Sequence, residues 1–290
     1  MLQKKFSFAA CALALAITAN ARAASLETPL ERATKAFEAG QYKAVVEAAS
    51  TVAATDADAP RVQYLAGEAE LVLGDAAAAE TAFRAVLKAR PKAVPAQVGL
   101  ARALTVLTKY DEARPLLDAA LTADPKDTSA LTARGLLLAR MGKHDEGLKD
   151  LKAAYAADAK SSLTVRAMVE FLVDIEDFAE AARISDEFVK ARPEHPMGDF
   201  LRALVYEKEN KDTDAIARYQ KALEKDPAFL DAHKNLAILC HTLSNTYKDK
   251  ERTKLAYEHY KTYFELGGSD PTLKSMYEML LQYKDQIMGS

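Results

Sequence analysis

The sequence predicts an all-α protein built as a solenoid, in which a pair of helices repeats about every 34 residues. Good helix formers dominate the 290 residues, Trp is absent, and almost no segment alternates apolar and polar residues as a half-buried strand would. The segment KYDEARPLLDAALTADPKD at 109–127 returns as TDAIARYQKALEKDPAF at 213–229. Ala113 matches Ala215, an offset of 102 residues, which is three periods of 34. A fixed period of this length is typical of stacked repeat proteins.

The N-terminal segment 1–23 predicts a secretory signal peptide. Two lysines at positions 4 and 5 precede an apolar run over 6–17, and Ala-Arg-Ala at 21–23 has the small-residue pattern of a cleavage site. The run is shorter than the roughly 20 apolar residues that a membrane-spanning helix needs. We therefore expect export to the periplasm or cell envelope, with residues 24–290 forming one soluble solenoid domain after cleavage.

Charge and cysteine content argue against several classes of protein. The chain has a formal net charge of −3 and no long basic tract, so we do not expect nucleic acid as a partner. Once residues 1–23 are removed, Cys240 is the one remaining thiol, so no internal disulfide can form. The fold must therefore depend on helix packing.

Small residues recur at two positions of each 34-residue unit. The first column comprises Ala33, Gly67, Ala101, Gly135, Val169, Ala203 and Ala237, and the second comprises Val45, Ala79, Ala113, Gly147, Ala181 and Ala215. Two antiparallel helices approach closely only where small side chains lie at the crossing, so we expect the two columns to meet there. Gly40, Gly74 and Gly142 fall between the helices, where Gly favours a left-handed turn. Pro closes most units, because it cannot continue a helix.

This pattern resembles the tetratricopeptide repeat (TPR) family, and the resemblance covers residues 26–264. It implies a right-handed superhelical solenoid of about seven helix–turn–helix units. The expected units are 26–59, 60–93, 94–127, 128–161, 162–195, 196–229 and 230–268. The sequence departs from the family where an aromatic residue is usual early in the first helix, and where Arg32, Arg134 and Arg202 replace a Leu.

The last unit breaks the period. Asp249 stands where a small residue is due, and Ala256 supplies that residue seven positions later, so we expect two extra helical turns or a longer loop. Asp270 and Pro271 are typical of a helix start and predict a capping helix over 271–288. Its apolar stripe comprises Leu273, Met276, Tyr277, Leu280 and Leu281. Such a helix would cover the open end of the stack.

Motifs for catalysis and cofactor binding are missing. The sequence has no Gly-rich phosphate loop, nucleophile elbow, H-E-x-x-H or C-x-x-C. His233, Cys240 and His241 could share a helical face, but their spacings of seven and eight do not suit a metal, and Cys240 falls in a core column. Acidic residues cluster at helix starts, where they suit the helix dipole. We therefore predict no enzymatic activity, no cofactor and no metal.

The resemblance places a partner-binding groove along the first helices of the units. The residues expected to face it are Tyr64, Glu68, Val98, Arg102, Thr132, Leu136, Arg140, Arg166, Glu170, Phe200, Leu204, Lys234 and Ile238. The family's carboxylate-binding pairs of Lys and Asn are missing from these positions. Instead Arg102, Arg140 and Arg166 suggest a cationic centre for an acidic segment with apolar residues. The alternative is that these arginines form ion pairs with Glu68 and Glu170.

Together these features predict a protein–protein interaction scaffold of the bacterial cell envelope. A superhelix exposes a long concave face that suits a partner peptide or helix. We expect a role in assembly of an envelope complex, such as a pilus or a secretion, motility or polysaccharide-export machine. The alternative is a solenoid that binds a glycan or small ligand, which the scarcity of aromatic residues in the expected lining disfavours. A dimer through the C-terminal aromatic residues is left open.

Overall fold

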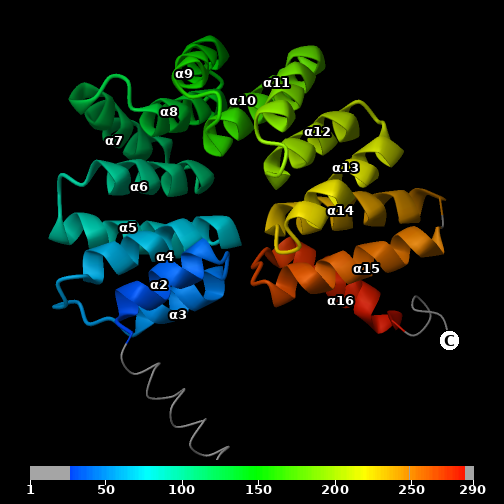
Figure 1. The fold of residues 1–290 in the computed structure, drawn as a ribbon, viewed down its shortest axis with the longest axis horizontal. Helices are drawn as coiled ribbons and strands as arrows, with labels where there is room; N and C mark the ends of the chain where they lie inside the picture. The colour runs from blue at the N-terminus through cyan, green and yellow to red at the C-terminus, as the bar shows by residue number, and fades with distance from the viewer. Residues whose placement is uncertain (1–26, 248, 285–290) are drawn as a thin grey trace, which may run out of the picture.

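The computed structural model describes residues 27–247 and 249–284, which fold into fifteen α-helices with no strand (Figure 1). This confirms the predicted all-α class. Each helix pairs with the next in an antiparallel hairpin, and the hairpins stack in chain order. Residues 1–26, which include the predicted signal peptide, lie outside the described residues.

Seven hairpins and one terminal helix make up the stack. The first helices are α2 (Pro29–Glu38), α4 (Ala59–Leu73), α6 (Val94–Val106), α8 (Thr128–Arg140), α10 (Ser162–Asp174), α12 (Pro196–Lys208) and α14 (Leu230–Tyr247). The second helices are α3 (Tyr42–Ser50), α5 (Ala76–Ala89), α7 (Tyr110–Ala123), α9 (His144–Ala157), α11 (Phe178–Ala191), α13 (Asp212–Lys225) and α15 (Lys250–Glu265), and the terminal helix is α16 (Pro271–Gln282). Successive first helices contact one another from α2 to α12, so they lie on the inner side of the curve.

The turn inside each of the first six hairpins needs a left-handed residue at one fixed position. Gly40, Gly74 and Gly142 occupy it with φ of 68°, 88° and 76°, as the sequence predicted. Three residues that are not Gly take the same conformation in other units, namely Thr108, Glu176 and Asn210 at φ of 60°, 62° and 58°. This conformation therefore recurs at the same place in successive units whatever the side chain, because the hairpin geometry requires it.

The two columns of small residues meet where the helices of a pair cross. A Cβ atom added to Gly147 on α9 would lie 2.7 Å from the carbonyl oxygen of Gly135 on α8. Ala101 and Ala113, one period earlier, are both fully buried in one cluster. Backbones in such close contact leave no space for a larger side chain, which explains the two columns.

The irregular last unit is lengthened within a helix. α14 has 18 residues, whereas α6, α8, α10 and α12 have 13 each, so the extra turns extend α14 and do not form a long loop. Asp270 caps α16 by accepting hydrogen bonds from the amides of Thr272 and Leu273. α16 ends at Gln282, earlier than the predicted 288, and residues 285–290 lie outside the described residues.

The two ends of the stack meet. Figure 1 shows α2–α4 beside α14–α16, so the solenoid curves until its first hairpin approaches its last. Leu73, at the end of α4, belongs to the same buried cluster as residues of α10–α16. The array is therefore closed, with the first helices along its inner face.

Candidate partner-binding groove

The inner face carries two ion-pair centres built by the first helices. In the first, Arg102 on α6 donates through Nη1 to both carboxylate oxygens of Glu68 on α4, at 3.1 and 2.9 Å. Both side chains are largely buried, with 26% and 19% exposed. The residues are one period apart in the chain, so the pair joins equivalent places in neighbouring units.

Arg166 forms the second centre. Its Nε donates to Glu170 on the same helix, α10, at 2.7 Å, and its Nη1 donates to Asp231 on α14 at 2.5 Å. The guanidinium lies 5.6 Å from the ring centre of Phe200 on the intervening α12. Burial opposes the charged form, but the two carboxylates outweigh it and raise the pKa of Arg166 above its ordinary value. Arg166 therefore bridges from the fifth unit to the seventh, across the sixth.

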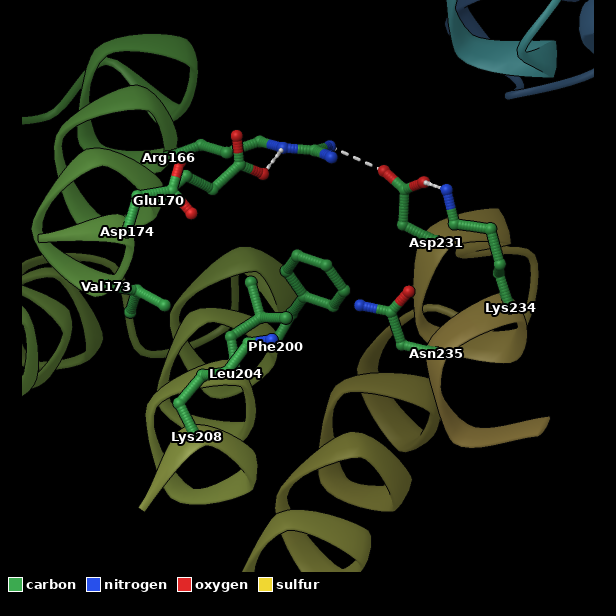
Figure 2. Close-up of a pocket in the computed structure, with 10 residues that line it drawn as sticks. All are labelled: Arg166, Glu170, Val173, Asp174, Phe200, Leu204, Lys208, Asp231, Lys234 and Asn235. Carbon is green, nitrogen blue, oxygen red and sulfur yellow. Dashed lines mark hydrogen bonds and ion pairs between the residues drawn. The ribbon is translucent and has the colours of Figure 1, made fainter. Parts of the chain in front are cut away.

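A pocket of about 230 Å³ opens beside this bridge (Figure 2). Phe200 and Leu204 of α12, together with Val173, give it an apolar lining. The charged and polar residues around them are Arg166, Glu170, Asp174, Lys208, Asp231, Lys234 and Asn235. Figure 2 shows Arg166 reaching over Phe200 to Asp231, with Lys234 on the far side of the same carboxylate, 3.6 Å away.

The arginines do not form the free cationic centre that the sequence suggested first. Arg102 and Arg166 are paired with Glu68 and Glu170, which was the alternative, and Arg166 has Asp231 as a further partner. The pocket holds three cationic and three anionic side chains. Its surface is therefore balanced in charge around an apolar centre.

Two predicted groove residues are buried in the stack. Val98 is 4% exposed and Thr132 is 1% exposed, and Thr132 forms a hydrogen bond of 3.1 Å with Thr164 of the next unit. These two side chains lie between neighbouring first helices and stabilise their packing. Phe200, in the same column, is also almost fully buried, yet it forms part of the pocket wall.

The other predicted residues surround these centres. Tyr64 lies against Phe83 with ring centres 5.8 Å apart, and burial with the neighbouring Glu68 raises its pKa to about 12. Leu136 and Ile238 are half-buried against the core cluster of the C-terminal half. Arg140 is exposed at the end of α8, and within the described part of the chain it has no ion pair.

Five pocket residues escaped prediction. These are Val173, Asp174, Lys208, Asp231 and Asn235. Asp231 lies three residues before the predicted Lys234, on the same face of α14, so helical spacing alone could have included it. Asp174 and Lys208 lie four residues, or one helical turn, after the predicted residues Glu170 and Leu204. Arg140 has the same relation to the predicted Leu136, so the same spacing would have included Asp174 and Lys208 in the predicted groove.

Three of the histidines form hydrogen bonds with other side chains. His233 Nδ1 lies 2.8 Å from Nδ1 of His259, and His241 Nδ1 lies 3.3 Å from the hydroxyl of Tyr260. Cys240 is fully buried. In the part of the chain that is described, no group of three or more His, Cys, Asp or Glu side chains is placed to hold a metal ion. Over the same residues, no helix has the length and apolar character needed to cross a membrane.

These features define an α-solenoid of helix–turn–helix repeats with a polar inner face. Two family models described as tetratricopeptide repeat match the sequence, one at residues 71–137 and the other at 30–94 and 169–228. Together they cover more than half of the chain, which is therefore a tetratricopeptide repeat protein. A search of curated protein sequences gave no match.

Solved structures share this fold at low sequence identity. A tetratricopeptide repeat protein from Parabacteroides merdae superposes with a TM-score of 0.57 at 16% identity, over 87% of this chain and 97% of that one. The protein TTC0263 from Thermus thermophilus gives 0.55 at 20% identity, over 62% and 98%. Human IFIT1, solved as a dimer with PPP-AAAA, gives 0.52 at 17% identity, over 78% and 64%. At these identities the likeness extends to the fold alone.

Proposed function

We propose that this chain is a non-enzymatic scaffold that holds a segment of another protein on its inner face. Tetratricopeptide repeat folds generally mediate protein–protein interaction. The observation that carries the proposal is the pocket over Phe200 and Leu204. Its volume of about 230 Å³ is below the roughly 300–1,000 Å³ of most small-molecule sites. It suits one large apolar side chain from a longer segment.

The charged rim indicates what should flank that side chain. A carboxylate on the partner would meet Arg166, Lys208 and Lys234, and it would compete with Asp231 for the guanidinium. Such an exchange keeps Arg166 paired, and the displaced Asp231 keeps Lys234, 3.6 Å away, as its partner. We therefore propose an acidic segment with an apolar anchor residue.

The cell envelope is the proposed location. This rests on residues 1–23, whose two lysines, apolar run and Ala-Arg-Ala end are typical of an export signal. A scaffold there would serve the assembly of a pilus or of a secretion, motility or polysaccharide-export complex.

The pocket can be tested by matched substitutions of two leucines. Leu204→Glu places a carboxylate in the apolar pocket, whereas Leu281→Glu makes the same change at a residue of α16 that is 45% exposed and outside the pocket. The parent and both variants are used to select peptides from a random display library and to capture proteins from envelope extracts, with helix content checked by circular dichroism.

The proposal expects peptides with acidic and apolar residues to bind the parent and Leu281→Glu, and to lose at least tenfold in affinity for Leu204→Glu. Equal binding by all three folded proteins would exclude the pocket as the site. Recovery of glycans without any protein or peptide would favour the glycan alternative.

A further inference from the structure

The first two hairpins make direct polar contacts with the C-terminal end of the array. The Nζ atom of Lys43 on α3 donates to the carbonyl oxygens of Phe264 and Glu265, at 3.1 and 3.4 Å. These carbonyls end α15, where a cation is favoured by the helix dipole. The hydroxyl of Ser269, in the turn before α16, donates to the carbonyl oxygen of Leu73 at 3.0 Å. The partners are 196 to 222 residues apart in the chain.

Close packing accompanies these hydrogen bonds. Gly267 has a φ of +111°, and a Cβ atom there would lie 2.7 Å from Cε of Lys43 and 2.9 Å from Cδ2 of Leu73. Leu73 is 5% exposed and belongs to the core cluster of the C-terminal half. The turn between α15 and α16 is therefore fitted to the ends of α3 and α4 (Figure 1).

Such a contact is unusual for a solenoid, because each repeat normally touches only its neighbours. The hairpins of this chain already stack on their neighbours without it. Tyr42 and Val46 of α3 are only partly buried where they pack against the cluster that holds Leu73, and Lys43 is exposed to solvent. Breaking it would therefore separate the ends while the stacking of individual repeats persists.

We propose that Lys43, Leu73, Gly267 and Ser269 form a latch that holds the solenoid closed and that opens as a unit. In the closed form, the two ends of the array are in contact, so a segment reaches the inner face only by threading into the ring along its axis. In the open form, an internal segment of a folded partner enters from the side. A ligand that binds the open form more tightly shifts the population toward it.

The latch can be tested without any partner, by the distance between two spin labels. Glu47→Cys on α3 and Glu278→Cys on α16 place the labels on exposed residues at the two ends. The full chain carries Cys11→Ser in addition, so that position 11 takes no label. Cys240 can stay, because it is buried and burial raises its pKa to about 12, which leaves the thiol unreactive.

The test variant combines Lys43→Glu with Ser269→Ala, which removes both hydrogen-bond donors and places a carboxylate beside the carbonyls. The matched control is Lys35→Glu on the neighbouring helix α2, where the lysine pairs with Glu27 and is 77% exposed. Double electron–electron resonance measures the label distances, and circular dichroism measures the helix content. If the double variant loses helix content, the distance is measured in Lys43→Met alone, which removes the Lys43 donor without adding a charge.

The latch predicts one narrow distance in the parent and the control, and a second, longer population in the latch variant with unchanged helix content. A broad distribution in the parent would show that the ends do not meet in solution. A single unchanged distance in a folded latch variant would show that these contacts do not hold the ends together. Either of the last two results would overturn the proposal.

Discussion

Replacing Gly147 by Ala tests the crossing of α8 and α9 with two opposing effects. In the middle of an exposed helix, Gly→Ala is stabilising by about 1 kcal/mol, because Ala has the higher helix propensity. Here the added Cβ would lie 2.7 Å from the carbonyl oxygen of Gly135 and 3.2 Å from the backbone nitrogen of Ala139. Both atoms are backbone, so no side chain can rotate away and the two helices must separate.

The clash is expected to outweigh the gain in propensity. Inserting one methyl group into a close-packed site costs about 1–3 kcal/mol, and the separation also weakens contacts around the crossing. Subtracting the propensity term of about 1 kcal/mol leaves a net loss of about 0–2 kcal/mol, and the clash with backbone atoms places the expected loss in the upper half of that range, at about 1–2 kcal/mol. The sign is therefore opposite to the one that helix propensity alone predicts.

Urea unfolding followed by circular dichroism measures this loss as a lower midpoint at an unchanged slope. Ala153→Gly on the exposed side of α9 is the matched control, and it should lose about 1 kcal/mol through propensity alone. Both substitutions, although opposite in direction, are thus expected to destabilise the protein. A variant with Gly147→Ala that is more stable than the parent would refute the close contact of the two backbones.

Five further outcomes are expected. Thr108→Gly should raise the free energy of unfolding by about 1 kcal/mol, because a β-branched residue at φ 60° is strained. Gly142→Thr at the equivalent turn should lower the free energy of unfolding by about 1–2 kcal/mol, and urea titration measures both changes. Ala101→Leu should cost about 1–3 kcal/mol, and an unchanged melting curve would contradict its place at a crossing. Burial lowers the pKa of His259 to about 4, whereas the ordinary value in the unfolded chain is about 6.5. The contribution of His259 to the free energy of unfolding is therefore fully present above pH 6.5 and falls by up to about 3 kcal/mol as the pH drops toward 4. The difference between the urea midpoints of the parent and His259→Gln should shrink over the same pH range. Mass spectrometry of the protein from its native host should find an N-terminus at or near Ala24, and an intact Met1 would contradict cleavage.

The sequence predicted the features that repeat. Small residues at crossings and Gly at hairpin turns leave a periodic signal, since each unit meets the same steric demand. The structure also explains two departures from the family. Arg134, in place of a Leu, donates to both oxygens of Asp150 at 2.7 and 3.1 Å. Asp199, where an aromatic residue is usual, is fully buried and pairs with Arg218 and Lys225.

Features that occur once in the array could not be predicted in this way. The bridge from Arg166 to Asp231 skips a unit, so it depends on how strongly the solenoid curves there. The contact of Lys43 with the end of α15 depends on the curvature summed over the whole array. Neither contact produces a periodic pattern in the sequence. The residues that form them are charged, and in the sequence nothing distinguishes them from other charged residues on the surface.

The closed array also restricts how this protein can change over evolutionary time. An open solenoid gains or loses a unit by duplication or deletion, and the effect on its shape is confined to one end. Here one additional helix–turn–helix unit would move α3 and α4 away from the turn that holds Gly267 and Ser269. Closure thus ties the number of units to the curvature, so that divergence should proceed by substitution within units, or by lengthening a single helix as in α14.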